Sequence, residues 1–146
     1  MPSFAQTFTI RTSPEAVWAL LSDIPRMAGL FPYLVVTELT SVGEGCWRYW
    51  RTLTIPGMPA LRWREEASLG VSGTLSFRAL EGDVKVFTGS WRITSNEGIT
   101  GLTLTVDYEF PEGVGGGLPM PLLLYAMGEL LKAMGQRVCD MAENQA

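Results

Sequence analysis

Residues 34–110 form a long stretch of alternating apolar and polar residues that is interrupted by short turn sequences. Turn-forming residues cluster at five places within it: 41–45, 56–59, 70–73, 81–83 and 96–98. Alternation of this kind is typical of half-buried strands, and glycine, proline, asparagine and aspartate mark the turns between them. The stretch therefore predicts six antiparallel strands, and a sheet of that size needs another element to cover its apolar face.

Shorter elements flank this stretch. Residues 4–11 alternate like a first strand, and Ser13 followed by Pro14 and Glu15 is typical of a helix start, so we expect a helix over 14–22. A second short helix reaches about residue 30, and a long helix begins at Leu122 after the glycine-rich loop 111–121. The predicted order is β-α-α-β6-α in one α+β domain over 1–146, with about seven antiparallel strands curved around the long C-terminal helix.

Composition narrows the function. With 47% hydrophobic and 18% charged residues, the chain is more apolar than a typical soluble domain, so apolar side chains are expected to line more than a minimal core. The net charge of -4 disfavours nucleic acid as a partner. The sequence has no histidine, which excludes histidine-based nucleophiles, HExxH zinc sites and histidine proton shuttles. Cys46 and Cys139 lack a metal-binding spacing, so we expect a reduced, cytoplasmic protein without a cofactor or metal.

Three segments, SPEAVWALLSDIPRMAGLFPYL, FRALEGDVKVFTGSWRI and TGLTLTVDYEF, together with the order of the elements, resemble the START-like helix-grip superfamily, also called SRPBCC. The resemblance covers nearly the whole chain and is nearest to the polyketide cyclase/dehydrase and lipid-transport proteins and to the coenzyme Q-binding proteins. It implies a helix-grip fold with a deep apolar cavity between the sheet and the last helix. It does not imply a particular ligand or a catalytic set, because the superfamily holds lipid carriers, hormone receptors, allergens and cyclases.

The predicted hairpin over 46–69 carries charge on its apolar face. A turn centred near Met58 places Leu53 opposite Trp63, Arg51 opposite Glu65, Tyr49 opposite Ala67 and Trp47 opposite Leu69, all on one face. Arg51 and Glu65 would then meet inside that face as a pair. We interpret them as a polar anchor for a ligand head group or as an acid–base element of a cyclase. The alternatives are a structural pair at the sheet edge, or a register that differs by one residue and turns both side chains outward.

Strand alternation and helix periodicity select the other candidate cavity residues. The last helix carries a stripe at spacings of three and four, formed by Met127, Leu130, Met134, Val138 and Met141. Methionine adapts to irregular contents better than branched residues do, although such a stripe is also typical of an ordinary core. Gly128 and Gly135, which weaken a helix by about 1 kcal/mol each, suggest that a neighbour approaches closely. The predicted ligand cavity comprises Trp47, Tyr49, Trp63, Phe77, Phe87, Trp91, Tyr108, Met127, Leu130 and Met134.

The tip of the same hairpin, residues 53–61, is unusually apolar. We expect Ile55, Met58 and Leu61 to form an entrance loop that contacts a membrane or a partner protein transiently, with the glycine-rich loop 111–121 beside it. A tip that packs against its own molecule is the alternative interpretation.

These patterns together favour a binding protein over an enzyme. We expect a monomer or homodimer that takes a lipid, isoprenoid or quinone-like molecule into the cavity as a carrier or chaperone. A polyketide aromatase/cyclase that uses the same cavity is the alternative, with Tyr49, Arg51, Glu65 and Tyr108 as its candidate acid–base groups. A protein-interaction module that uses the apolar tip is a third hypothesis.

Overall fold

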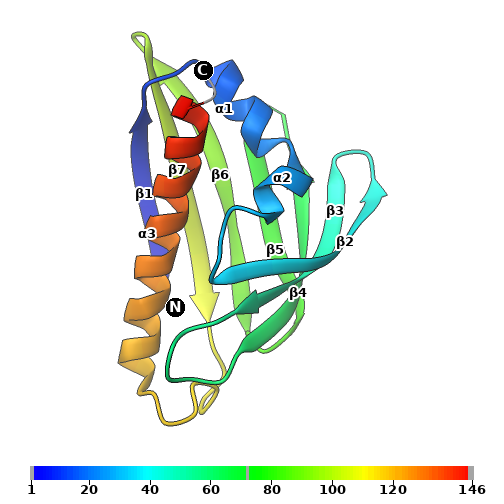
Figure 1. The fold of residues 1–146 in the computed structure, drawn as a ribbon, viewed down its shortest axis with the longest axis vertical. Coiled ribbons are helices and arrows are strands. Elements are labelled where there is room, and N and C mark those ends of the chain that lie inside the picture. The colour runs from blue at the N-terminus through cyan, green and yellow to red at the C-terminus, as the bar shows by residue number, and fades with distance from the viewer. Residues whose placement is uncertain (1, 72, 145–146) are drawn as a thin grey trace.

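The computed structural model describes residues 2–71 and 73–144. Residues 1, 72, 145 and 146 of the domain predicted over 1–146 lie outside the described residues. In chain order the elements are β1 (Ser3–Ile10), α1 (Pro14–Leu21), α2 (Ile24–Ala28), β2 (Leu34–Gly43), β3 (Cys46–Leu53), β4 (Leu61–Leu69), β5 (Thr74–Gly82), β6 (Val86–Asn96), β7 (Ile99–Glu109) and α3 (Met120–Asn144). The strands form one antiparallel sheet in the order β1-β7-β6-β5-β4-β3-β2, and α3 crosses one face of it (Figure 1). The predicted helix-grip architecture is confirmed.

The two short helices begin where the local sequence caps them. Ser13 has an extended backbone and its hydroxyl accepts a hydrogen bond from the N–H of Ala16, with Pro14 at the first helical position. Asp23 caps α2 in the same way, because its carboxylate accepts from the N–H of Arg26 at 3.4 Å. α2 is only five residues long. None of the helices in the described residues is long and apolar enough to cross a membrane.

The long helix α3 is seated on β1 through Gly135. A Cβ atom on Gly135 would overlap the ring of Phe8 in β1, so glycine is what lets helix and strand approach this closely. A Cβ atom on Gly128 would lie 3.9 Å from the hydroxyl of Tyr108, which is an ordinary contact, so the close approach predicted at both glycines is found at Gly135 alone.

The buried side of α3 differs in part from the predicted stripe. The residues buried there are Leu123, Met127, Leu131, Met134, Gly135, Val138, Cys139 and Ala142, and the helix begins two residues earlier than predicted, at Met120. Leu130 and Met141 of the predicted stripe are only partly buried. The reason is that Gly135 faces β1, which brings Leu131 and Cys139, four residues away on either side, into the interface in their place.

The β3–β4 register differs by two residues from the predicted one. Tyr49 pairs with Glu65, Arg51 with Trp63, and Leu53 with Leu61. The turn is centred on Gly57, which adopts a φ of 88°, and not on Met58. Because side chains along a strand alternate with a period of two, a shift of two residues leaves every side chain on the predicted face.

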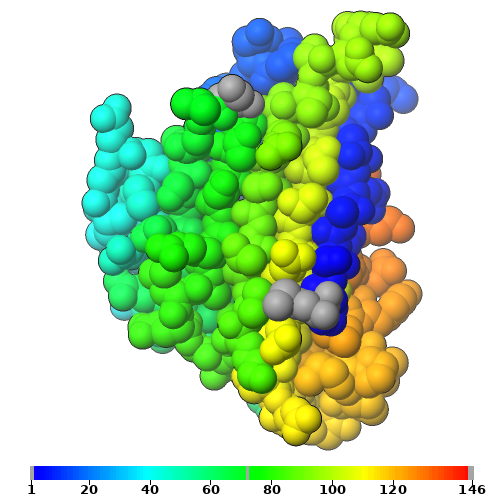
Figure 2. All heavy atoms as spheres, turned by 180° about the vertical axis from the view of Figure 1, so that it is seen from behind, coloured from blue at the N-terminus to red at the C-terminus, as the bar shows by residue number. Residues whose placement is uncertain are grey.

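Register shifts bend the sheet on both sides of this hairpin, two between β2 and β3 and one between β4 and β5. In β2, Glu38 and Leu39 together lie opposite Tyr49, and Glu38 has a left-handed φ of 56°. In β5, the extra residue Leu80 interrupts the pairing with β4 next to Glu65. Bulges of this kind increase the twist of a strand and re-aim its side chains. Figure 2 shows the outer face of the sheet, from β2 and β3 at one margin to β1 at the other, where α3 emerges from behind.

Candidate functional site

A cavity lies between the sheet, the α2 segment and α3. Its walls are Ile24, Met27, Ala28, Phe31, Val36, Leu39, Tyr49, Arg51, Glu65, Ala67, Leu75, Phe77, Phe87, Trp91 and Met134. The empty space between these atoms is about 510 Å³ when the open mouth is included, but only about 40 Å³ of it is wide enough for the centre of a water molecule. That is room for roughly three water molecules, whereas small-molecule sites usually offer about 300–1,000 Å³. A ligand of lipid size therefore needs more space than these walls enclose.

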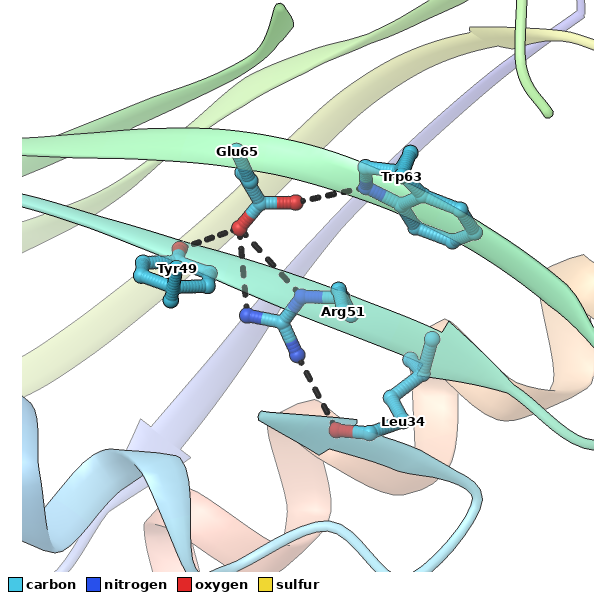
Figure 3. A network of polar contacts seen from close by, with 5 residues as sticks. All are labelled: Leu34, Tyr49, Arg51, Trp63 and Glu65. Carbon is cyan, nitrogen blue, oxygen red and sulfur yellow. Dashed lines mark hydrogen bonds and ion pairs between the residues drawn. The ribbon is translucent and has the colours of Figure 1, made fainter. Parts of the chain in front are cut away.

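A buried polar network occupies one wall of the cavity (Figure 3). Glu65 is fully buried, and its Oε2 accepts hydrogen bonds from the hydroxyl of Tyr49 and from Arg51, through Nε at 3.3 Å and Nη2 at 3.1 Å. Its Oε1 accepts from the indole Nε1 of Trp63 at 3.0 Å. Arg51 also donates through Nη1 to the carbonyl of Leu34, at 3.3 Å, at the start of β2. Sequence alternation predicted this meeting of Arg51 and Glu65, but not the phenol, the indole and the carbonyl that complete it.

The network fixes the charge of its members. Burial is the largest single effect on Arg51 and would lower its pKa, but the charges and hydrogen bonds of Glu65 and Tyr49 together outweigh burial, so that the pKa of Arg51 is raised above its ordinary value. Burial, with the Glu65 charge next in size, raises the pKa of the Tyr49 phenol well above its ordinary value. Arg51 is therefore a cation, and Tyr49 is a neutral phenol that donates a hydrogen bond to Glu65.

This arrangement leaves hydrogen-bond donors for a ligand. A guanidinium carries five N–H groups. Three N–H groups of Arg51 make the hydrogen bonds described above, which leaves up to two on the terminal nitrogens. Both carboxylate oxygens of Glu65 are already occupied by donors. Because Arg51 lines the cavity and is 9% exposed, the wall suits an oxygen acceptor such as a ketone, a quinone or an enolate.

The structure divides the predicted site residues into three groups. Those that line the cavity are Tyr49, Arg51, Glu65, Phe77, Phe87, Trp91 and Met134. Trp63, Tyr108 and Met127 are buried in the core without lining the cavity. Leu130 lines a neighbouring groove, and Trp47 is half-buried near the start of β3, opposite Ala67, and does not line the cavity.

The buried group supports the wall from behind. Trp63 packs on Phe87 with ring centroids 5.0 Å apart, in addition to its hydrogen bond to Glu65. The hydroxyl of Tyr108 donates to the carbonyl of Leu124 in the first part of α3, at 3.4 Å. Trp63 thus holds two lining residues in place, and Tyr108 ties β7 to α3.

The residues of one cavity wall were not predicted from the sequence. Ile24, Met27 and Ala28 of α2 and Phe31 after it close one side, and the apolar spacing of this short helix is the signal that could have shown it. Leu39 of β2 also lines the cavity. Simple alternation could not place Leu39, because the bulge at Glu38 interrupts it.

The predicted entrance loop packs against its own molecule. Ile55 and Met58 are half-buried against the core, and Leu61 is a buried residue at the start of β4, so it does not belong to the loop. The tip also touches the glycine-rich loop, since a Cβ atom on Gly116 would lie 3.2 Å from the Cδ of Pro59. In the described residues, His, Cys, Asp and Glu side chains form no cluster of three that could hold a metal ion.

Comparison with known proteins places these features in a family. Solved structures similar to this chain include a protein of Thermus thermophilus, which is 25% identical over 94% of this chain and 97% of its own, with a TM-score of 0.77. The Zhui aromatase/cyclase of Streptomyces sp. R1128 is 22% identical, with coverages of 99% and 94% and a TM-score of 0.80. A START superfamily protein of Mycobacterium smegmatis is 15% identical over 99% of both chains, with a TM-score of 0.75. No curated protein matches this chain. The family model described as polyketide cyclase/dehydrase and lipid transport matches residues 1–141, and the chain therefore belongs to that family.

Proposed function

We propose that this protein binds a hydrophobic or amphipathic small molecule, such as a lipid, an isoprenoid or a quinone, in the cavity and carries or protects it. The observation that carries the proposal is the buried guanidinium of Arg51 in an otherwise largely apolar wall. Donors in such a wall suit a ligand with one oxygen acceptor and a large apolar body. Burial of that body supplies about 25 cal/mol per Å² before ordering losses, which favours tolerance of ligand shape.

Acid–base catalysis has less support from the geometry. The titratable residues that line the cavity are Tyr49, Arg51 and Glu65, and they are hydrogen-bonded to one another. A general base needs a free lone pair within reach of the proton that it removes. The carboxylate of Glu65, which already accepts four hydrogen bonds, is poorly placed for that role.

An aromatase/cyclase is the second candidate function, and Arg51 is the observation that favours it. A buried cation that donates hydrogen bonds can stabilise the enolate oxygen that develops when a poly-β-ketone chain closes by aldol addition. One of the similar solved structures is that of the Streptomyces aromatase/cyclase, whose name points to the same chemistry. In this candidate Arg51 polarises the ketone, and water accepts the proton.

Binding is tested with quinones, whose ring quenches tryptophan fluorescence when it lies near Trp91 in the cavity wall. We expect saturable quenching by a benzoquinone that carries one isoprene unit. Ala67→Leu and Val36→Phe narrow the cavity from different strands and should each abolish quenching, whereas Val42→Phe on the exposed end of β2 should not. Circular dichroism identifies any variant that fails to fold. Equal affinity in the folded cavity variants and the wild type would overturn the proposal.

Catalysis is tested with a linear poly-β-ketone whose closure to an aromatic ring is followed by absorbance. The carrier proposal predicts the same rate with and without the protein. An acceleration that Arg51→Lys reduces while binding persists would establish the cyclase in its place. Native mass spectrometry of the freshly purified protein, followed by organic extraction, would identify a ligand that it already carries.

We further propose that the carrier meets a membrane at the end of the molecule where the 54–60 loop and the start of α3 lie together (Figure 1). Leu122 and Tyr125 are 53% and 67% exposed there. Such apolar and aromatic groups partition into lipid interfaces. Leu122→Glu should reduce sedimentation with phosphatidylcholine vesicles, and Val42→Glu, an exposed position at the far end of another hairpin, serves as the control. Equal sedimentation of both variants and the wild type would exclude this contact surface.

A further inference from the structure

A second hollow lies beside the cavity, on the other side of two of its residues. It is a groove lined by residues from 30–34, at the connection of α2 to β2, and from 130–137 of α3. Figure 1 shows where these two segments lie in the fold. About 320 Å³ of it is wide enough for the centre of a water molecule, compared with about 40 Å³ in the cavity. The larger space is thus the groove, outside the cavity that holds the polar network.

Phe31 and Met134 line both spaces and separate them. Each is 7% exposed, and they come from different elements: Phe31 from the segment after α2, and Met134 from α3. Methionine is unbranched and has three rotatable bonds, so its side chain can leave this position without moving the helix. Rotation of Met134, or a small displacement of Phe31 with the five-residue helix before it, would join the groove to the cavity.

The residues that line the groove are suited to bind a hydrocarbon chain. Its floor is formed by Leu30, Pro32, Leu130 and Ala133 in addition to the two shared residues. Arg137 is the one charged residue among those that line it, and its side chain is exposed. An apolar floor that continues the apolar wall of the cavity is suited to a chain that runs from one into the other.

We propose that cavity and groove are two halves of one ligand site, in which an oxygen-bearing head lies against Arg51 and an apolar tail passes between Phe31 and Met134 into the groove. This inference rests on the proposed function and specifies its ligand class: an amphipathic carbonyl compound with an alkyl or isoprenoid tail. It also explains how a cavity with so little enclosed volume can bind a ligand of lipid size, because most of the ligand lies outside the cavity.

The test compares benzoquinones that share one head group and carry a tail of zero, one or two isoprene units. In the wild type we expect affinity to rise with tail length by about tenfold or more per unit, since each fully buried methylene is worth about a fourfold gain. Ala133→Glu places a charge on the floor of the groove at an exposed helical position, and Ala133→Trp fills it by bulk. Gln136→Glu adds the same charge to α3 outside the groove and is the matched control.

The outcomes separate a failure of the groove assignment from a failure of the proposed binding function. Support requires that both Ala133 variants bind the tailless quinone like the wild type and lose the gain from the tail, while Gln136→Glu keeps that gain. If the tail still raises the affinity of both Ala133 variants as much as that of the wild type, the tail lies elsewhere and the groove is not part of the site. If the wild type binds none of the three quinones, the proposed function itself fails for this ligand class.

Discussion

The two glycines of α3 allow a direct test of how the helix is seated. Gly128→Ala and Gly135→Ala are the same substitution seven residues apart in one helix, and each gains about 1 kcal/mol of helix propensity. The new methyl group at Gly128 meets the Tyr108 hydroxyl at 3.9 Å, which is an ordinary contact. At Gly135 it overlaps two ring atoms of Phe8, and such overpacking costs about 1–3 kcal/mol. Because the propensity gain cancels in the comparison, Gly135→Ala should be less stable than Gly128→Ala by about 1–3 kcal/mol.

Urea unfolding followed by tryptophan fluorescence measures this difference as the free energy of unfolding of each variant. Gly128→Ala is expected to exceed the wild type by up to about 1 kcal/mol. In the background of Phe8→Leu, which shortens the obstructing side chain, the gap between the two alanine variants should shrink. Equal stabilisation by both alanine substitutions in the wild-type background would show that α3 does not lie against β1 as described.

Two further predictions concern the polar network. Arg51→Met leaves the buried Glu65 without its cation and should lower the free energy of unfolding by about 3–5 kcal/mol, whereas Arg48→Met, which breaks an ion pair of a 41% exposed side chain, should cost about 0–1 kcal/mol in the same urea experiment. Similar losses in both would contradict the assigned burial. Because the pKa of Tyr49 is raised by folding, its stabilising contribution is complete below about pH 10, the pKa of an unfolded tyrosine, and is lost above it. Tyr49→Phe should therefore lose less stability than the wild type between about pH 9 and 11, and parallel losses would refute this assignment.

The order of the elements and the face of each side chain in the hairpin could be predicted because both depend on local patterns. Alternation, turn residues and the Ser13–Pro14 cap are properties of neighbouring residues, and they give the strands and the first helix. The ion pair between Arg51 and Glu65 was predicted from the wrong strand register. It is nevertheless found, because an error of two residues does not change which face a side chain occupies.

What the sequence did not show depends on contacts between distant segments. Whether Gly128 or Gly135 meets a neighbour is decided by where β1 crosses the helix, and either glycine satisfies the local pattern equally. Leu39 faces the cavity because of a bulge that no repeat in the sequence marks. The narrowness of the cavity depends on how Phe31 and Met134 fill the space between α2 and α3, which is a property of the folded packing.

The placement of the bulges indicates where the sheet is expected to bend. β3 and β4 pair without interruption, whereas the pairings of β2 with β3 and of β4 with β5 each contain a shift. Tyr49, Arg51, Trp63 and Glu65 all belong to the uninterrupted pair. We expect β3 and β4 to behave as one rigid pair, and the β2–β3 and β4–β5 boundaries to be more flexible. Amide hydrogen exchange should then be fastest along these two boundaries. The volume of the cavity can then change while the groups that recognise the head of the ligand keep their mutual geometry.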